Sequence, residues 1–82
     1  MPRYYFHVLN GKNFIDEVGT EADNIDALKA EAVAFAGGIL KSERPTDMWR
    51  GIAWEMRVTD SPAPDGGRTH LTLTLTATAA SV

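Results

Sequence analysis

The sequence contains no cysteine, so a disulfide, a thiolate metal site and a cysteine nucleophile are all excluded. It also lacks a long hydrophobic run, because the longest one, Ala32 to Leu40, is about half of a membrane span and includes two glycines. No apolar segment of signal-peptide length follows the first residues. These absences favour a cytoplasmic protein that does not enter a membrane.

Charge is mostly balanced along the chain. The net charge is −3, and the surplus acid lies between residues 21 and 40. Later basic residues alternate with acids, so no basic face is concentrated for binding phosphate groups. Nucleic acid is therefore not an expected partner. Tryptophans and arginines between residues 44 and 57 keep a nucleic-acid-binding regulator as the third hypothesis.

With 82 residues, the chain has room for one hydrophobic core. A domain of this size buries only about two-thirds of its unfolded surface, so a partner subunit would add useful stability. We predict a single domain over residues 1–76. The tail at residues 77–82 loses the preceding alternation and is expected to lack order.

Four segments have the composition of strands. Residues 3–9 are rich in aromatic residues and end at Asn10-Gly11, a strong hairpin-turn signal. A short second strand is predicted at 13–15, before a polar segment in which Gly19 is expected to adopt a positive φ. Residues 52–59 alternate apolar with polar side chains, and residues 71–76 alternate leucine with threonine.

One helix is predicted between the second and third strands. Asn24 or Asp23 can cap its first turn, and apolar residues then recur every three or four positions from Ile25 to Leu40. Two adjacent glycines weaken the last turn by about 1 kcal/mol each. The helix is therefore expected to end at these glycines or to fray as far as Lys41.

These elements predict an α+β two-layer sandwich of order ββαββ, a four-stranded antiparallel sheet with one helix on one face. The expected strand order is 2-1-3-4. The other sheet face has no predicted cover. Two registers remain open for that face, which carries either Tyr5, His7 and Leu9 or Tyr4, Phe6 and Val8, together with the threonines of the last strand.

Four stretches of this chain are similar to a known family. They are Met1-Pro2-Arg3-Tyr4-Tyr5-Phe6-His7, Asn10-Gly11, Asp16-Glu17-x-Gly19-x-Glu21 and the helix start Asn24-Ile25-x-Ala27-x-x-Ala30-x-Ala32. The chain resembles short bacterial proteins classed as a domain of unknown function, which open Met-Pro-Arg-Tyr-Phe-Phe and carry Asp-x-x-Gly before an Ala/Glu-rich helix. The resemblance is clear to about residue 40 and looser beyond. It implies a cytoplasmic ββαββ domain and no known activity, substrate or cofactor.

Only His7 and His70 could act as general bases near neutral pH. No nucleophile or glycine-rich oxyanion loop accompanies them, so no catalytic residue is predicted. A ligand-binding or hydrolytic domain that uses a sheet-face histidine is the alternative hypothesis.

Acidic side chains crowd the loop at residues 16–23, and oxygen ligands suit Ca²⁺ or Mg²⁺. Their spacing is not that of an EF-hand loop, and turn and helix-dipole roles explain them better than a metal site does. We predict no cofactor, while the question of a metal at this loop stays open.

The leading hypothesis is a non-enzymatic protein-interaction module. It would associate with itself as a homodimer, or with another protein, through the uncovered sheet face or a sheet edge. Candidate contact residues are Tyr5, His7, Thr72 and Thr74 on the sheet, and Ala30, Ala34 and Gly38 along the helix. For the helix residues, the alternative explanation is that alanine is simply the best helix former.

Overall fold

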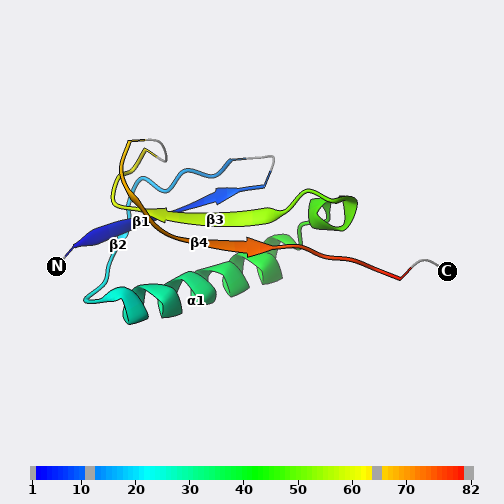
Figure 1. Ribbon diagram of the computed structural model, residues 1–82, viewed down its shortest axis with the longest axis horizontal. Helices are drawn as coiled ribbons and strands as arrows, with labels where there is room; N and C mark the ends of the chain where they lie inside the picture. The colour runs from blue at the N-terminus through cyan, green and yellow to red at the C-terminus, as the bar shows by residue number, and fades with distance from the viewer. Residues whose placement is uncertain (1, 11–12, 64–65, 81–82) are drawn as a thin grey trace.

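The fold is a four-stranded sheet with one helix packed against one face (Figure 1). The computed structural model describes residues 2–10, 13–63 and 66–80. Its elements are β1 (Arg3–Leu9), β2 (Thr20–Glu21), α1 (Ile25–Glu43), the 3₁₀ helix η1 (Asp47–Arg50), β3 (Trp54–Thr59) and β4 (Thr69–Leu75). The predicted α+β class and the ββαββ order are confirmed, and η1 is an additional element that was not predicted.

All neighbouring strands are antiparallel, and their spatial order is β2-β1-β3-β4. The predicted order 2-1-3-4 is therefore confirmed. β2 forms one edge of the sheet with only two residues, whereas β4 forms the other edge with seven. The two edges thus differ greatly in the length of backbone that they present.

Both ends of α1 are capped. The side chain of Asn24 accepts a hydrogen bond from the backbone N–H of Ala27 at 2.8 Å, as predicted for this residue. At the other end, Arg44 adopts a left-handed conformation with φ 48° and donates its backbone N–H to the carbonyl of Leu40.

The helix continues through its two glycines to Glu43, so the predicted end was wrong. Ile39 and Leu40, which follow the glycines, pack against the core from the last turns of α1. This packing outweighs the helix-propensity cost of the glycines, which is about 1 kcal/mol each.

The core lies between α1 and one face of the sheet. Its buried residues are Leu28, Ala32 and Ala36 from the helix, Phe6 and Val8 from β1, Trp54, Met56 and Val58 from β3, and Ala22. Phe6 also meets Phe35 of α1 edge-to-face, with ring centroids 4.9 Å apart. The even-numbered residues of β1 therefore face the helix, which decides the register that the sequence left open.

The second strand lies later than predicted. In the predicted segment 13–15, Phe14 forms an isolated bridge with Val8, with backbone hydrogen bonds of 2.9 and 2.8 Å. The strand itself is β2, which pairs with the start of β1. Between them the chain turns at Gly19, whose φ of 77° agrees with the expected positive value. Gly11, in the predicted hairpin turn, lies outside the described residues.

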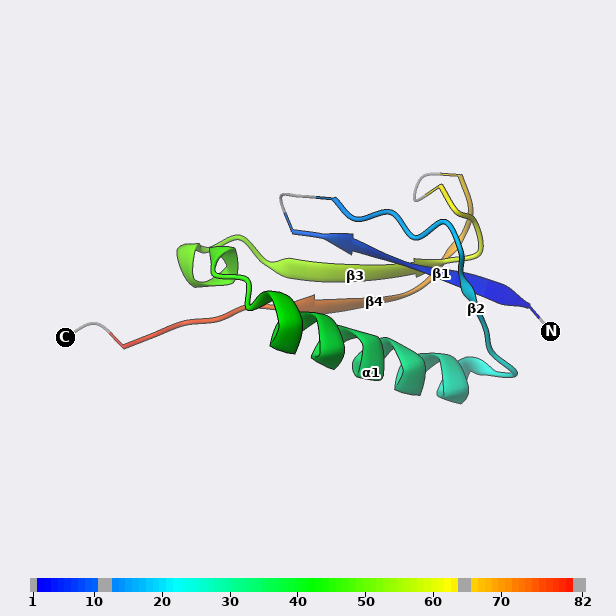
Figure 2. The same ribbon diagram turned by 180° about the vertical axis from the view of Figure 1, so that it is seen from behind.

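The sheet face away from α1 is partly covered, contrary to expectation. The segments that precede β2 and follow β3 lie on this side of the sheet, opposite α1 (Figure 2). Their contacts leave His7 and Thr59 with 0% exposure. The face is open mainly over β4, where Thr72 and Thr74 are exposed.

The tail after β4 has no regular secondary structure at residues 77–80 and continues the line of the strand (Figure 1). Residues 81–82 lie outside the described part of the chain. Within the described ranges, no helix is long and apolar enough to cross a membrane.

Candidate functional site

His7 links two loops that cover part of the sheet face away from α1. Its Nε2 lies 3.1 Å from Oγ1 of Thr59 and 3.2 Å from the carbonyl oxygen of Ser61. Its Nδ1 accepts the backbone N–H of Asp16 at 3.1 Å. A nitrogen that accepts a hydrogen bond carries no proton, so the ring is neutral with its proton on Nε2.

This geometry gives His7 a structural role. A side chain with no exposed surface cannot meet a substrate, and Asp16 turns its backbone rather than its carboxylate to the ring. For the same reason His7 cannot touch a partner directly, so it is not a contact residue of the folded chain. Tyr5, its neighbour on the same face, is partly exposed.

His70 stands apart from His7, because β3 separates their strands. Its Nε2 lies 3.1 Å from Oδ2 of Asp60, and its ring meets that of Tyr4 edge-to-face at 5.1 Å. The two histidines therefore have separate partners and do not form a common site.

Asp16 holds its loop together through its carboxylate. Oδ2 accepts the N–H of Phe6, and Oδ1 accepts those of Val18 and Gly19, all at 3.0 Å. Burial raises the pKa of the Asp16 carboxyl, but these N–H groups outweigh it and hold the pKa below its ordinary value. A Cβ on Gly19 would come within 2.8 Å of the Tyr5 ring, which explains why glycine follows three residues after this aspartate.

The acidic loop does not assemble a metal site in the described part of the chain, where no group of three or more acidic or histidine side chains is close enough to hold an ion. Several arginines are also neutralised locally. The ion pairs are Arg3 with Glu21 at 3.7 Å, Arg57 with Glu55 at 2.9 Å and Arg50 with Asp47 at 4.0 Å.

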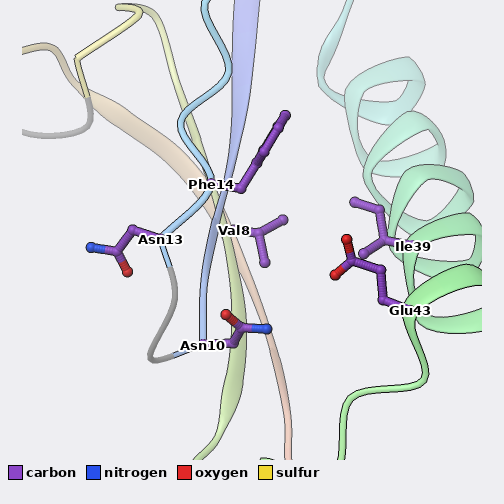
Figure 3. A pocket seen from close by; sticks show the side chains of 6 residues that line it. All are labelled: Val8, Asn10, Asn13, Phe14, Ile39 and Glu43. Atoms are coloured by element: carbon purple, nitrogen blue, oxygen red, sulfur yellow. The ribbon is translucent and has the colours of Figure 1, made fainter.

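A cleft opens between β1 and the last turns of α1 (Figure 3). It has a volume of about 310 Å³ and is lined by Val8, Asn10, Asn13, Phe14, Ile39 and Glu43. The side chains of Ile39 and Glu43 point towards β1 (Figure 3). Three of the lining side chains are apolar, two are amides and one is a carboxylate. The cleft lies on the helix side of the sheet, so His7 does not line it.

The hydrogen-bond pattern shows which backbone groups of β4 face outward. Val8 exchanges both of its backbone hydrogen bonds with Phe14, on the side of β1 away from β3. Val8 is paired with Met56, which is paired with Leu73. Hydrogen-bonded and non-hydrogen-bonded pairs alternate along an antiparallel ladder, and Val8 and Met56 form a non-hydrogen-bonded pair because the backbone groups of Val8 are turned to Phe14. The backbone groups of Met56 therefore bond to β4, and the N–H and C=O of Leu73 point towards β3.

It follows that the backbone groups of Thr72 and Thr74 point away from the sheet. In the described part of the chain, no segment pairs with this edge. The side chains of both threonines are exposed on the face opposite α1. The structure thus brings these two predicted contact residues together on one free edge.

The three helix candidates, Ala30, Ala34 and Gly38, are exposed on α1 away from the sheet. A Cβ added to Gly38 would meet nothing within 4 Å. These residues therefore do not share a surface with Thr72 and Thr74.

The fold defines a class of protein, the two-layer ββαββ domain with one long free edge strand. Within this class, the chain belongs to the family described as a domain of unknown function (DUF6894), whose model matches residues 3–76. Comparison with curated proteins found no match, and comparison with solved structures found none either.

Proposed function

We propose that the chain is a protein-interaction module that adds an extended strand of another protein chain to the free edge of β4. The observation that carries this proposal is the outward backbone of Thr72 and Thr74 on a seven-residue edge. Strand addition satisfies such groups with main-chain hydrogen bonds, while alternate side chains give specificity.

The composition of β4 supports this role. Edge strands are usually protected against pairing by charged side chains, proline or short length. From Thr69 to Ala80 the sequence has no proline, lysine, arginine or acidic residue. The β2 edge, by contrast, has two residues and carries the ion pair of Arg3 with Glu21.

The rival hypotheses have weaker support. Burial of His7 removes one of the two histidines on which the hydrolytic alternative depended. Ion pairing of Arg3, Arg50 and Arg57 weakens the nucleic-acid hypothesis. The cytoplasm stays the predicted compartment, a prediction that the sequence alone supports.

A display library of short extended peptides tests strand addition, because it offers the edge many partner sequences at once. Peptides selected on the wild-type chain would be measured against the variants Thr74→Pro and Thr74→Val. Proline removes the outward N–H of residue 74 and leaves the hydrogen bonds between β4 and β3 intact. Valine keeps the N–H and the strand propensity, so it is the matched control.

We expect selected peptides to bind the wild type and Thr74→Val and to lose binding to Thr74→Pro. Backbone NMR shifts on binding should be largest at Thr72 and Thr74. Equal binding to both variants would contradict the proposal.

A further inference from the structure

We infer that the strand added at β4 is β4 of a second copy of this chain, so that two sheets join across a two-fold axis at Leu73. This inference rests on the proposed strand addition and names its partner. An antiparallel pair of identical strands is the symmetric way to satisfy the same edge on both copies.

Charge favours a second copy at this edge. An isologous contact brings identical side chains together, so charged residues would repel across it. The chain carries a net charge of −3, yet β4 has no acidic or strongly basic residue. The edge is therefore a long surface on which two copies meet without opposing like charges.

The regular part of β4 fixes the register. A β-bulge interrupts the ladder between Val58 and Thr59, so regular pairing with β3 covers Leu71 to Leu75. The centre of this stretch is Leu73. Pairing about Leu73 places Leu71 opposite Leu75 of the second copy, so every leucine meets a leucine on the helix side of the sheet.

The same register pairs Thr72 with Thr74 of the second copy. Their outward backbone groups then exchange hydrogen bonds in both halves of the dimer. Centring the axis on Thr72 would instead place Leu75 opposite Thr69, so a core-side leucine would lose its apolar partner.

A flank of α1 lies above this edge. Leu40 lines an apolar hollow with Leu75 and Thr76 at the end of β4, which identifies the side of the helix that faces the edge. Successive residues are rotated by about 100° around the helix axis, so Val33 lies about 20° from Leu40 around this axis and Gly37 about 60° from it. Val33 is 62% exposed. This flank therefore shows apolar surface beside the unpaired strand.

Gly37 lies close to the proposed axis. The helix and β4 run in the same direction (Figure 1), and Leu73 precedes Leu75 by roughly 7 Å, or four to five helical residues. Since Leu40 lies beside Leu75, the helical residues level with Leu73 come about four to five positions before Leu40, just before Gly37. Two antiparallel helices would approach one another there, where a side chain at residue 37 would come between them.

The two adjacent glycines provide a matched pair for a test. A Cβ at either position would meet nothing within 4 Å in this chain, so substitution of either should leave the fold intact. Gly38 lies about 60° from Phe35, which packs on β1, and therefore falls on the opposite flank. The variants Gly37→Leu and Gly38→Leu differ only in which flank they enlarge.

The first measurement is the solution mass by light scattering over a wide range of protein concentration. We expect the wild type and Gly38→Leu to reach about twice 8.9 kDa, and Gly37→Leu to stay at the mass of one chain. Urea unfolding of each variant at low concentration confirms that the chain is folded. A wild type that stays monomeric would overturn the inference but leave peptide addition at β4 to its own test.

The second measurement uses the absence of cysteine in the chain, which makes single-cysteine variants clean probes. In the proposed register, residues 72 and 74 of different copies face each other at a Cα distance of about 5.5 Å, within disulfide range. Two copies of residue 72 would lie about 8 Å apart, which is too far.

We therefore expect an equimolar mixture of Thr72→Cys and Thr74→Cys to form a disulfide-linked dimer, while each variant alone does not. Efficient cross-linking of one variant alone would overturn the register. If Gly37→Leu and Gly38→Leu each dimerise with the same affinity, the proposed contact between the two α1 helices would be overturned.

Discussion

The backbone N–H of Asp16 donates to Nδ1 of His7 across 3.1 Å, although the two residues are nine positions apart in the sequence. The other ring nitrogen of His7 reaches Thr59 and Ser61, at the end of β3 and just beyond it. A neutral imidazole thus connects the loop before β2 with the loop after β3. This link is what closes the sheet face over β1 and leaves β4 as the open part.

Replacing His7 with phenylalanine should destabilise the fold by about 1–3 kcal/mol, because a phenyl ring fills the buried site but gives the N–H of Asp16 no acceptor. His7→Gln, which retains a polar amide, should cost less. Urea unfolding of the two variants measures the difference. Equal or greater stability of His7→Phe would show that the link contributes nothing.

Gly19→Ala should destabilise the fold more than Gly51→Ala. Both glycines have positive φ, 77° and 91°, so alanine is strained at either position by about 1 kcal/mol. At Gly19 the new methyl group would also lie 2.8 Å from the Tyr5 ring, whereas at Gly51 it would meet nothing within 4 Å. Thermal or urea unfolding of both variants separates the steric cost from the backbone cost, and equal losses would contradict the steric explanation.

The sequence correctly predicted the elements in which a side-chain pattern repeats over many residues. Leucine–threonine alternation defined β4, and the apolar repeat from Ile25 located α1. The position of the short second strand was predicted wrongly, because β2 has two residues and depends on Asp16 and the turn at Gly19 rather than on its own side chains. No periodicity could reveal this arrangement.

The candidate site was predictable in part. Thr72 and Thr74 were identified from alternation, but the direction of their backbone groups depends on a hydrogen-bond register that starts at Val8. Burial of His7 was not predictable, because the covering residues lie in loops without a repeating pattern. The Asp-x-x-Gly spacing at residues 16–19 was the available signal of an ordered loop at this position, since it marks a turn that an aspartate stabilises.

Gly38→Ala should raise the free energy of unfolding by about 0.5–1 kcal/mol. The glycine lies inside α1 with an ordinary helical backbone, and a methyl group there would meet nothing within 4 Å. Chemical denaturation of the variant and the wild type at the same concentration measures the gain. A loss of stability would mean that the glycine serves a contact within the folded chain.

The carboxyl of Asp16 should make stability depend on pH in the acid range. Its pKa lies below the ordinary value of 3.8 in the folded chain, because the N–H groups that bind the carboxylate outweigh the opposing effect of burial. A depressed pKa contributes stability above the unfolded value, and this contribution is lost as the pH falls through the folded value. His70 and the N–H of Arg68 also lower the pKa of Asp60, which titrates in the same range.

Asp16→Asn isolates the contribution of this residue from that of Asp60. At neutral pH the variant should be less stable than the wild type, because asparagine has one neutral oxygen in place of two charged ones, and its NH₂ group, a donor, must face either the N–H of Phe6 or those of Val18 and Gly19. The difference should shrink as the pH falls below the ordinary value of 3.8, around which the carboxyl of the unfolded chain becomes protonated, and on through the lower pKa of the folded chain. Urea unfolding of both proteins between neutral and acid pH measures it, and a difference that is constant with pH would show that the charge of Asp16 does not hold the loop.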